Sequence, residues 1–184
     1  MYYDVILSGF GGQGILLIGD ILAQAAMMED KHVTWMPAYG VEMRGGAANC
    51  TVVISSETIG SPITDEPQGL ICMSKPSLLK FQEKIKKDGL LIVNTSFVEE
   101  GLVTRKDLER ICLPASELAF QEVGQHKMAN MIVFGAFLAA SGVVSPQTVE
   151  AALTELFQGE KEKHIPPMIQ AMKCGMNYKD KQEV

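Results

Sequence analysis

The sequence lacks a surplus of positive charge. Its 184 residues include 16 Lys and Arg against 22 Asp and Glu, so the net charge at pH 7 is −6. Nonspecific nucleic-acid binding needs a basic surface, and binding to an anionic membrane needs a basic face. The composition therefore argues against nucleic acid and against membrane as partners.

Long hydrophobic runs are also missing. No apolar stretch approaches the roughly 20 residues that a membrane-spanning helix needs. Residues 1–4 (MYYD) do not begin a signal peptide, because no basic segment precedes an apolar one there. We therefore expect a cytoplasmic protein.

The sequence has no clustered cysteines. Its four are widely spaced and form no CxxC pair: Cys50, Cys72, Cys112 and Cys174. Iron–sulfur clusters and structural zinc ions usually draw on closely spaced thiols. Cys50 and Cys72 stand in apolar, strand-like runs, where buried thiols behave as small hydrophobic residues. No metal site is therefore expected.

A residue set that could run a reaction unaided is absent as well. None of the three histidines (His32, His126 and His164) has a second histidine four residues along, which excludes an HExxH zinc site. The G-x-S-x-G elbow and the P-loop lysine are missing too. The adjacent acids Asp65 and Glu66 lie in a turn-rich segment, where solvated carboxylates are expected. We therefore assign no catalytic residue to the chain alone.

The composition is that of one ordinary globular domain, with 47% hydrophobic and 21% charged residues. Short apolar runs predict strands at residues 5–7, 32–37, 49–55, 70–73, 90–94 and 111–114. Helical spacing and N-cap signals predict helices at residues 15–28, 74–87, 116–122, 128–140, 147–157 and 164–174. A weaker extended piece at 102–105 and a short helix or turn at 107–110 complete the pattern.

Strands that alternate with helices predict an open, mostly parallel α/β sheet. The first strand, helix and second strand form a Rossmann-like βαβ unit in this prediction, and the C-terminal third is helical. We expect a single α/β domain at residues 1–176 and a polar tail at residues 177–184.

A glycine-rich turn joins the first strand to the first helix. Gly9, Gly11 and Gly14 match G-x-G-x-x-G, and Gly12 adds a fourth glycine. Glycine lets backbone approach a ligand closely, and the N–H groups at the start of a helix favour an anion. The side-chain amide of Gln13 could form hydrogen bonds across an interface.

The second half of the dinucleotide fingerprint is missing. An acid should end the second strand to hold the ribose hydroxyls, but residues 35–38 read WMPA. Glu29 and Asp30 precede that strand, at the wrong end. Three readings of the turn stay open: a phosphate-bearing cofactor site, a contact with a partner subunit, or a tight junction that binds nothing.

A second glycine-rich loop runs over residues 39–46. It begins at Tyr39, and Arg44, Gly45 and Gly46 could form a small concavity that binds phosphate or carboxylate. Glu42 lies two residues before Arg44 and could form an ion pair with it instead. Both alternatives stay open.

The chain resembles the gamma subunit of 2-oxoacid:ferredoxin oxidoreductases, the pyruvate/ketoisovalerate oxidoreductase gamma family. The similarity covers nearly the whole chain, and the segments that carry it are residues 9–14 (GFGGQG), 39–46 (YGVEMRGG), 61–67 (SPITDEP) and 130–135 (NMIVFG). The opening at residues 4–10 is more similar to the 2-oxoglutarate and 2-oxoisovalerate types, because the pyruvate type commonly has Arg where Phe10 stands.

The resemblance implies a subunit that is inactive alone. Its enzymes, typical of anaerobic metabolism, decarboxylate a 2-oxoacid oxidatively to an acyl-CoA and reduce ferredoxin. Thiamine diphosphate with Mg lies between their alpha and beta subunits, and iron–sulfur clusters lie in beta and in a ferredoxin-like delta subunit. The gamma subunit helps to place coenzyme A, and a homodimer is conceivable when it is isolated. The alternative function is a free-standing nucleotide-binding oxidoreductase or binding module.

Overall fold

The computed structural model describes residues 1–39 and 46–178, which form one α/β domain around a six-stranded sheet. The strands are β1 (Tyr2–Phe10), β2 (His32–Tyr39), β3 (Ala47–Ser55), β4 (Gly69–Cys72), β5 (Leu90–Asn94) and β6 (Glu109–Leu113). The α-helices are α1 (Ile15–Met28), α2 (Lys75–Phe81), α3 (Ala115–Val123), α4 (Ala129–Ser141), α5 (Pro146–Leu156) and α6 (Ile165–Met176). Short 3-10 helices are η1 (Gln82–Lys84), η2 (Glu100–Leu102), η3 (His126–Met128) and η4 (Gly159–His164).

The strand order is β2-β3-β1-β4-β5-β6. β1, β4, β5 and β6 pair in parallel, whereas β3 is antiparallel to both of its neighbours. The predicted mostly parallel α/β sheet is thus confirmed. The first unit differs from a Rossmann unit in one respect: β1 and β2 run in the same direction, but β3 lies between them.

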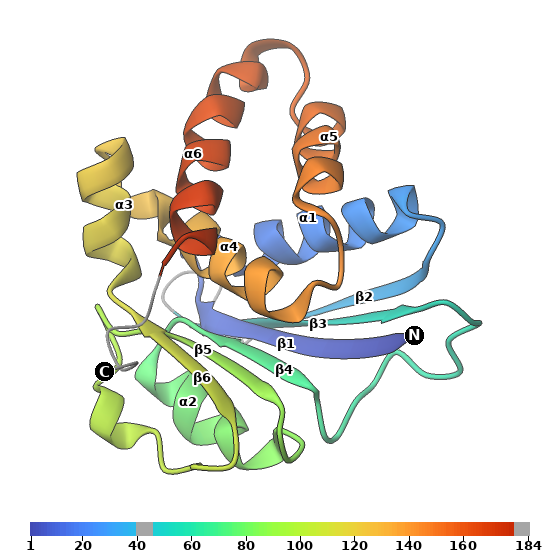
Figure 1. Ribbon diagram of the computed structural model, residues 1–184, viewed down its shortest axis with the longest axis vertical. Helices are drawn as coiled ribbons and strands as arrows, with labels where there is room; N and C mark the ends of the chain where they lie inside the picture. Colours follow the sequence, from blue (N-terminus) through green and yellow to red (C-terminus); the bar gives the residue numbers. More distant parts are fainter. Residues whose placement is uncertain (40–45, 179–184) are drawn as a thin grey trace.

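Helices cover the two faces of the sheet unequally. α1 and α4 pack on one face with α3, α5 and α6 outside them, and α2 lies on the other face (Figure 1). α4 is buried over most of its length, as its uniformly apolar sequence predicts. It crosses α6 so closely that a Cβ at Gly135 or Gly175 would collide with the backbone of the other helix. None of the described helices is long and apolar enough to cross a membrane.

Three local predictions were wrong in part. The strand predicted at 32–37 runs past Pro37 to Tyr39, because it lies at the edge of the sheet, where a missing N–H is tolerated. The turn predicted at 107–110 gives way to β6 at Glu109, whose N–H donates to the Gly89 carbonyl at 3.0 Å. The extended piece at 102–105 begins inside η2, which ends at Leu102.

Candidate functional site

The glycine-rich turn lies where the chain changes faces of the sheet. β1 leads into α1 on one face, while its parallel neighbour β4 leads into α2 on the other (Figure 1). Two adjacent parallel strands whose connections diverge leave a crevice at their carboxyl ends, and ligands of open α/β sheets bind there. The topology therefore places the turn at the position where a ligand site is expected.

Gln13 links the turn, through hydrogen bonds, to the segment that follows β4. Its side-chain oxygen accepts a hydrogen bond from the N–H of Phe10 at 2.6 Å, and its amide nitrogen donates to the Met73 carbonyl at 3.1 Å. A Cβ at Gly9 would lie 2.9 Å from the Met73 Cβ, so only glycine fits there without a shift. The Gln13 amide thus bonds within the chain.

The turn ends in an uncapped helix N-terminus. Gly14, the N-cap of α1, has a φ of +74°, and Gly12 has a φ of +97°. No side chain caps α1 and its first turn holds no acid, so its first N–H groups are available to an anion. Asn130, at the start of α4, donates to the Gly14 carbonyl at 3.4 Å and ties the turn to the helical layer.

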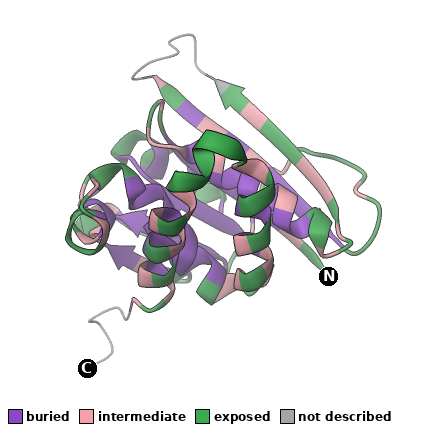
Figure 2. Ribbon diagram, turned by 90° about the horizontal axis from the view of Figure 1, so that it is seen from above, coloured by how far each residue is buried: buried purple, intermediate pink, exposed green. Residues whose placement is uncertain are grey.

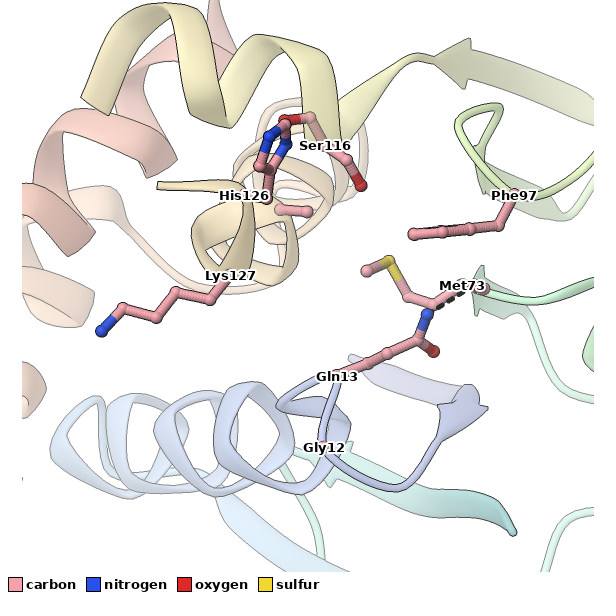
Figure 3. A pocket seen from close by; sticks show the side chains of 8 residues that line it. Gly12, Gln13, Met73, Phe97, Ser116, His126 and Lys127 are labelled. Atoms are coloured by element: carbon pink, nitrogen blue, oxygen red, sulfur yellow. Dashed lines mark hydrogen bonds between the residues drawn. The ribbon is translucent and has the colours of Figure 1, made fainter. Parts of the chain in front are cut away.

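Two cavities flank the turn and share Gly12 and Lys127. The first has a volume of about 250 Å³ and is lined by Gly12, Gln13, Met73, Phe97, Ser116, His126, Lys127 and Ala129. In Figure 3, Gln13 and Met73 form one wall, Phe97 stands at one end and Lys127 extends at the other. The second has a volume of about 300 Å³ and is lined by Gly12, Gly14, Leu17, Lys127, Met128, Asn130, Phe157, His164 and Met168.

The ionisable groups that line these cavities are all basic. Among the residues that the structure describes, they are Lys127, His126 and His164, and no described carboxylate joins them. The Nδ1 atom of His126 lies 3.0 Å from the Ser116 carbonyl, so this nitrogen carries a proton and donates. Together with the helix N-terminus, these groups make the crevice complementary to an anion.

The predicted site residues separate into four groups. Gly11, Gly12, Gln13 and Gly14 form the turn itself, and Gly9 lies just before it in β1. Gly46 is brought to it, because the Gly11 N–H donates to the Gly46 carbonyl at 2.9 Å. Tyr39 is the last residue of β2, whereas the predicted site residues Glu42, Arg44 and Gly45 lie outside the described residues.

Sequence reasoning missed most of the crevice walls. Met73 and Phe97 follow β4 and β5, and Lys127 precedes α4, so they meet the turn only through the fold. The one signal nearby was the 130–135 segment, which begins with the Asn130 that contacts Gly14. It gave no reason to choose Lys127, three residues earlier.

The cysteines are not placed for metal binding or nucleophilic chemistry. None of the four forms a disulfide bond, and burial raises the pKa of both Cys50 and Cys72 to about 12. These thiols stay protonated at neutral pH, as their predicted burial in strands implies. No three His, Cys, Asp or Glu side chains within the described ranges are grouped to hold a metal ion.

The fold and the crevice define an α/β domain of the doubly wound kind, with a basic, glycine-lined site at its switch point. The chain belongs to the pyruvate ferredoxin/flavodoxin oxidoreductase family, whose model matches residues 4–178. The resemblance detected in the sequence is thereby confirmed.

Three similar proteins show which members of the family this chain resembles. The 2-oxoglutarate synthase subunit KorC of Methanocaldococcus jannaschii is 34% identical over 90% of this chain and 89% of its own length. The ketoisovalerate oxidoreductase subunit VorA of Methanothermobacter marburgensis is 35% identical over 95% of this chain, which spans only 36% of VorA. A keto/oxoacid ferredoxin oxidoreductase gamma subunit from Geobacter sulfurreducens PCA superposes with a TM-score of 0.76 at 28% identity, covering 94% of this chain and 95% of its own.

Proposed function

We propose that this chain is the gamma subunit of a cytoplasmic 2-oxoacid:ferredoxin oxidoreductase, and that its crevice faces coenzyme A. The enzyme would oxidise 2-oxoglutarate or a branched-chain 2-oxoacid to the acyl-CoA and reduce ferredoxin. Similarity to KorC over nearly its full length supports the subunit role. The partners would be the alpha, beta and ferredoxin-like delta subunits, and cysteines that form no disulfide bond suit a reducing compartment.

The observation that carries the proposal is the basic crevice at the switch point. Coenzyme A has phosphates at one end and a largely uncharged thiol-bearing arm at the other. The phosphates would bind the N–H groups of α1 and the ammonium of Lys127, where Gly12 leaves room for them. The arm would follow the apolar side chains of Met73 and Phe97 in the first cavity.

Thiamine diphosphate and iron–sulfur clusters do not fit the described residues of this chain. The described part holds neither a group of carboxylates for a magnesium ion nor clustered thiols for a cluster. In this proposal the decarboxylation and the electron transfer belong to the partner subunits. This chain binds and orients coenzyme A.

The test is to exchange Lys127 for Glu in the assembled enzyme. Reversing the charge should raise the apparent KM for coenzyme A at least about tenfold, the effect of losing one charge-assisted hydrogen bond. The KM for the 2-oxoacid should not change. Lys84→Glu is the matched control, because Lys84 is exposed in η1. Unchanged coenzyme A kinetics in Lys127→Glu would contradict the proposed ligand.

Arg44 belongs to the same proposal on sequence grounds alone. If its guanidinium binds a phosphate of coenzyme A, Arg44→Ala in the assembled complex should raise the apparent KM for coenzyme A. Decarboxylation of the 2-oxoacid should remain largely intact. Coenzyme A kinetics equal to those of the wild type would remove Arg44 from the site.

The alternative of a free-standing nucleotide-binding oxidoreductase finds less support. Dinucleotide domains hold the ribose with an acid on the strand beside the first one. Here that neighbour is the antiparallel β3, and Ala47 stands opposite Phe10. Calorimetry of the isolated chain with NAD, NADP and FAD should detect no binding at millimolar ligand, whereas clear binding would favour this alternative.

A further inference from the structure

The two edges of the sheet differ in how well they are protected from pairing. β6 has only five residues and exposes the charged Glu109 and Arg110. β2 has eight residues, contains no Asp, Glu, Lys or Arg, and leaves Trp35 38% and Met36 36% exposed. Short strands, charged side chains and proline are the usual means of keeping another strand from an edge. β6 is short and charged, whereas β2 is longer, has no such charge and has only Pro37 among these means.

Pro37 indicates which backbone groups of β2 point outward. In an antiparallel ladder, alternate residues direct their N–H and C=O groups to the same neighbour. Pro37 lies opposite Cys50 of β3 and has no N–H, so it fits at an outward-directed position. Val33 and Trp35 share that alternation. Their N–H and C=O groups therefore face away from β3, toward whatever lies beside the edge.

An uncharged patch borders this edge on the face that carries α2. The strand register places Met36, Ala38, Ala47 and Phe10 on that face, and all four are exposed. α2 packs against β1 and β4 and does not extend over β2 (Figure 1). Figure 2 shows β2 in the exposed and intermediate colours along the margin of the sheet, beside the more buried β3. An exposed uncharged patch that includes large apolar side chains typically marks a contact site, so we interpret it as a face that a further layer covers.

The size of VorA indicates what supplies that layer. The present domain corresponds to only 36% of VorA, so in that relative it is covalently joined to a much larger remainder of the same chain. A permanently joined neighbour favours a large and apolar interface. A second copy of this chain is a poorer occupant, because two chains that each carry a net charge of −6 repel one another.

We propose that an extended segment of a partner subunit adds to β2 as a seventh strand and covers Met36 and Ala38. Its backbone would pair with Val33 and Trp35, and its side chains would fill the uncharged patch. Phe10 joins this patch to the glycine-rich turn, so the interface and the crevice are continuous. This assignment rests on the proposed role as a subunit.

Hydrogen–deuterium exchange reports the pairing directly. Exchange in a peptide that covers residues 32–39 should slow at least about tenfold when the chain enters the complex, because paired amides must open before they exchange. A peptide that covers 109–113, from the charged edge, is the internal control and should not change. Equal exchange of the 32–39 peptide in the free and assembled chain would overturn the proposal.

Two substitutions test the patch independently. The double variant Met36→Lys, Ala38→Lys should lower the assembled fraction about tenfold on co-expression, because two charges would be buried without partners. Its melting temperature as an isolated chain should stay that of the wild type, since both side chains are exposed. Leu79→Lys is the matched control, because Leu79 is 58% exposed on α2.

The outcomes separate the two proposals. Normal assembly of the double variant would overturn the strand assignment and leave the subunit role intact. The isolated wild-type chain could form dimers that the double variant does not form. That result would assign the edge to a second copy of this chain and would also overturn the strand assignment. Failure of the wild-type chain to assemble with any partner subunit would instead overturn the proposed function, and the strand assignment with it.

Discussion

Single glycines of the turn serve different purposes, although the sequence pattern treats them alike. Gly12 and Gly14 both have positive φ angles, which side chains other than glycine adopt only at a cost. A Cβ at Gly14 would collide with the side-chain amide of Asn130, whereas a Cβ at Gly12 would meet nothing within 4 Å. Gly14 is therefore required for packing, and Gly12 keeps the crevice open.

Alanine substitutions distinguish these two roles. Gly12→Ala and Gly14→Ala should each lower the free energy of unfolding by about 1–2 kcal/mol from backbone strain, with a further loss for Gly14→Ala from its collision. Urea denaturation measures both. In the assembled enzyme, Gly12→Ala should also raise the apparent KM for coenzyme A, because its methyl group projects into the space proposed for the phosphates.

Gly60→Ala is the control for both variants. Gly60 has no positive φ and open space around it, so its alanine variant should be nearly as stable as the wild type. Stability of Gly14→Ala equal to that of Gly60→Ala would contradict the packing role.

The sequence revealed the residues of the turn but not their partners. The motif context, a strand followed by a helix, was enough to place Gly14 at the start of α1, whereas Gly9 lies within β1, which runs beyond the predicted strand at 5–7. Gln13 could be predicted only as a residue able to form hydrogen bonds. That its amide reaches Met73 within the chain depends on β4 lying beside β1, a long-range pairing that no local pattern encodes.

At the scale of elements, a polar clip joins the end of α1 to the start of α5. Glu29, the C-cap of α1, accepts a hydrogen bond at 2.7 Å from the N–H of Ser145, which is itself the N-cap of α5. Lys31 donates to the second oxygen of Glu29 and to the Val143 carbonyl, both at 2.6 Å. Two connections far apart in the sequence are thereby held together on the helical side of the sheet.

The clip makes the stability dependent on pH. Burial alone raises the pKa of Glu29, but hydrogen bonds from Lys31, Ser145 and Thr148 outweigh it and lower the pKa to about 2. A carboxylate whose folded pKa is depressed stabilises the fold above its ordinary pKa and stops doing so as the pH falls through the folded value. Glu29→Gln should therefore lower the free energy of unfolding by about 1–2 kcal/mol at pH 7.

That difference should shrink steadily as the pH falls from about 4.5 toward 2. Urea titrations of the wild type and of Glu29→Gln at a series of pH values measure it. Glu66→Gln, at an exposed acid, provides the control and should not differ from the wild type at any pH. A stability gap for Glu29→Gln that does not vary with pH would show that the carboxylate is not the source of the stabilisation.

Element prediction succeeded where local signals were strong. Ser145 caps α5 as its position before Pro146 predicts, and the helix predicted at 116–122 is observed as α3 (Ala115–Val123). It failed at Pro37, because a proline ends a central strand but not an edge strand. Whether a strand is central or at an edge is decided by distant parts of the chain.

For the whole molecule, the alternation of strands and helices was sufficient to predict the class of fold. It could not predict that β3 turns back between β1 and β2, since both orders satisfy the same pattern of apolar runs. This insertion has two consequences. It removes the neighbouring strand that a dinucleotide site requires, and it leaves β2 as a long, uncharged edge.

Both consequences favour a domain that functions in contact with other subunits. The basic crevice has groups suited to bind an anion, but the described residues show no set that would transform it. No described helix or strand covers the uncharged patch, which Phe10 joins to the turn. A subunit that closes one wall of a shared active site accounts for the crevice and for the patch.

The most direct test of this account is an add-back experiment. The partner subunits are purified without this chain, and coenzyme A-dependent reduction of ferredoxin by the 2-oxoacid is measured before and after the chain is supplied. We expect no activity from the chain alone, little from the partners alone, and full activity with saturation by coenzyme A once they are combined. Full coenzyme A-dependent activity of the partners without this chain would contradict the account.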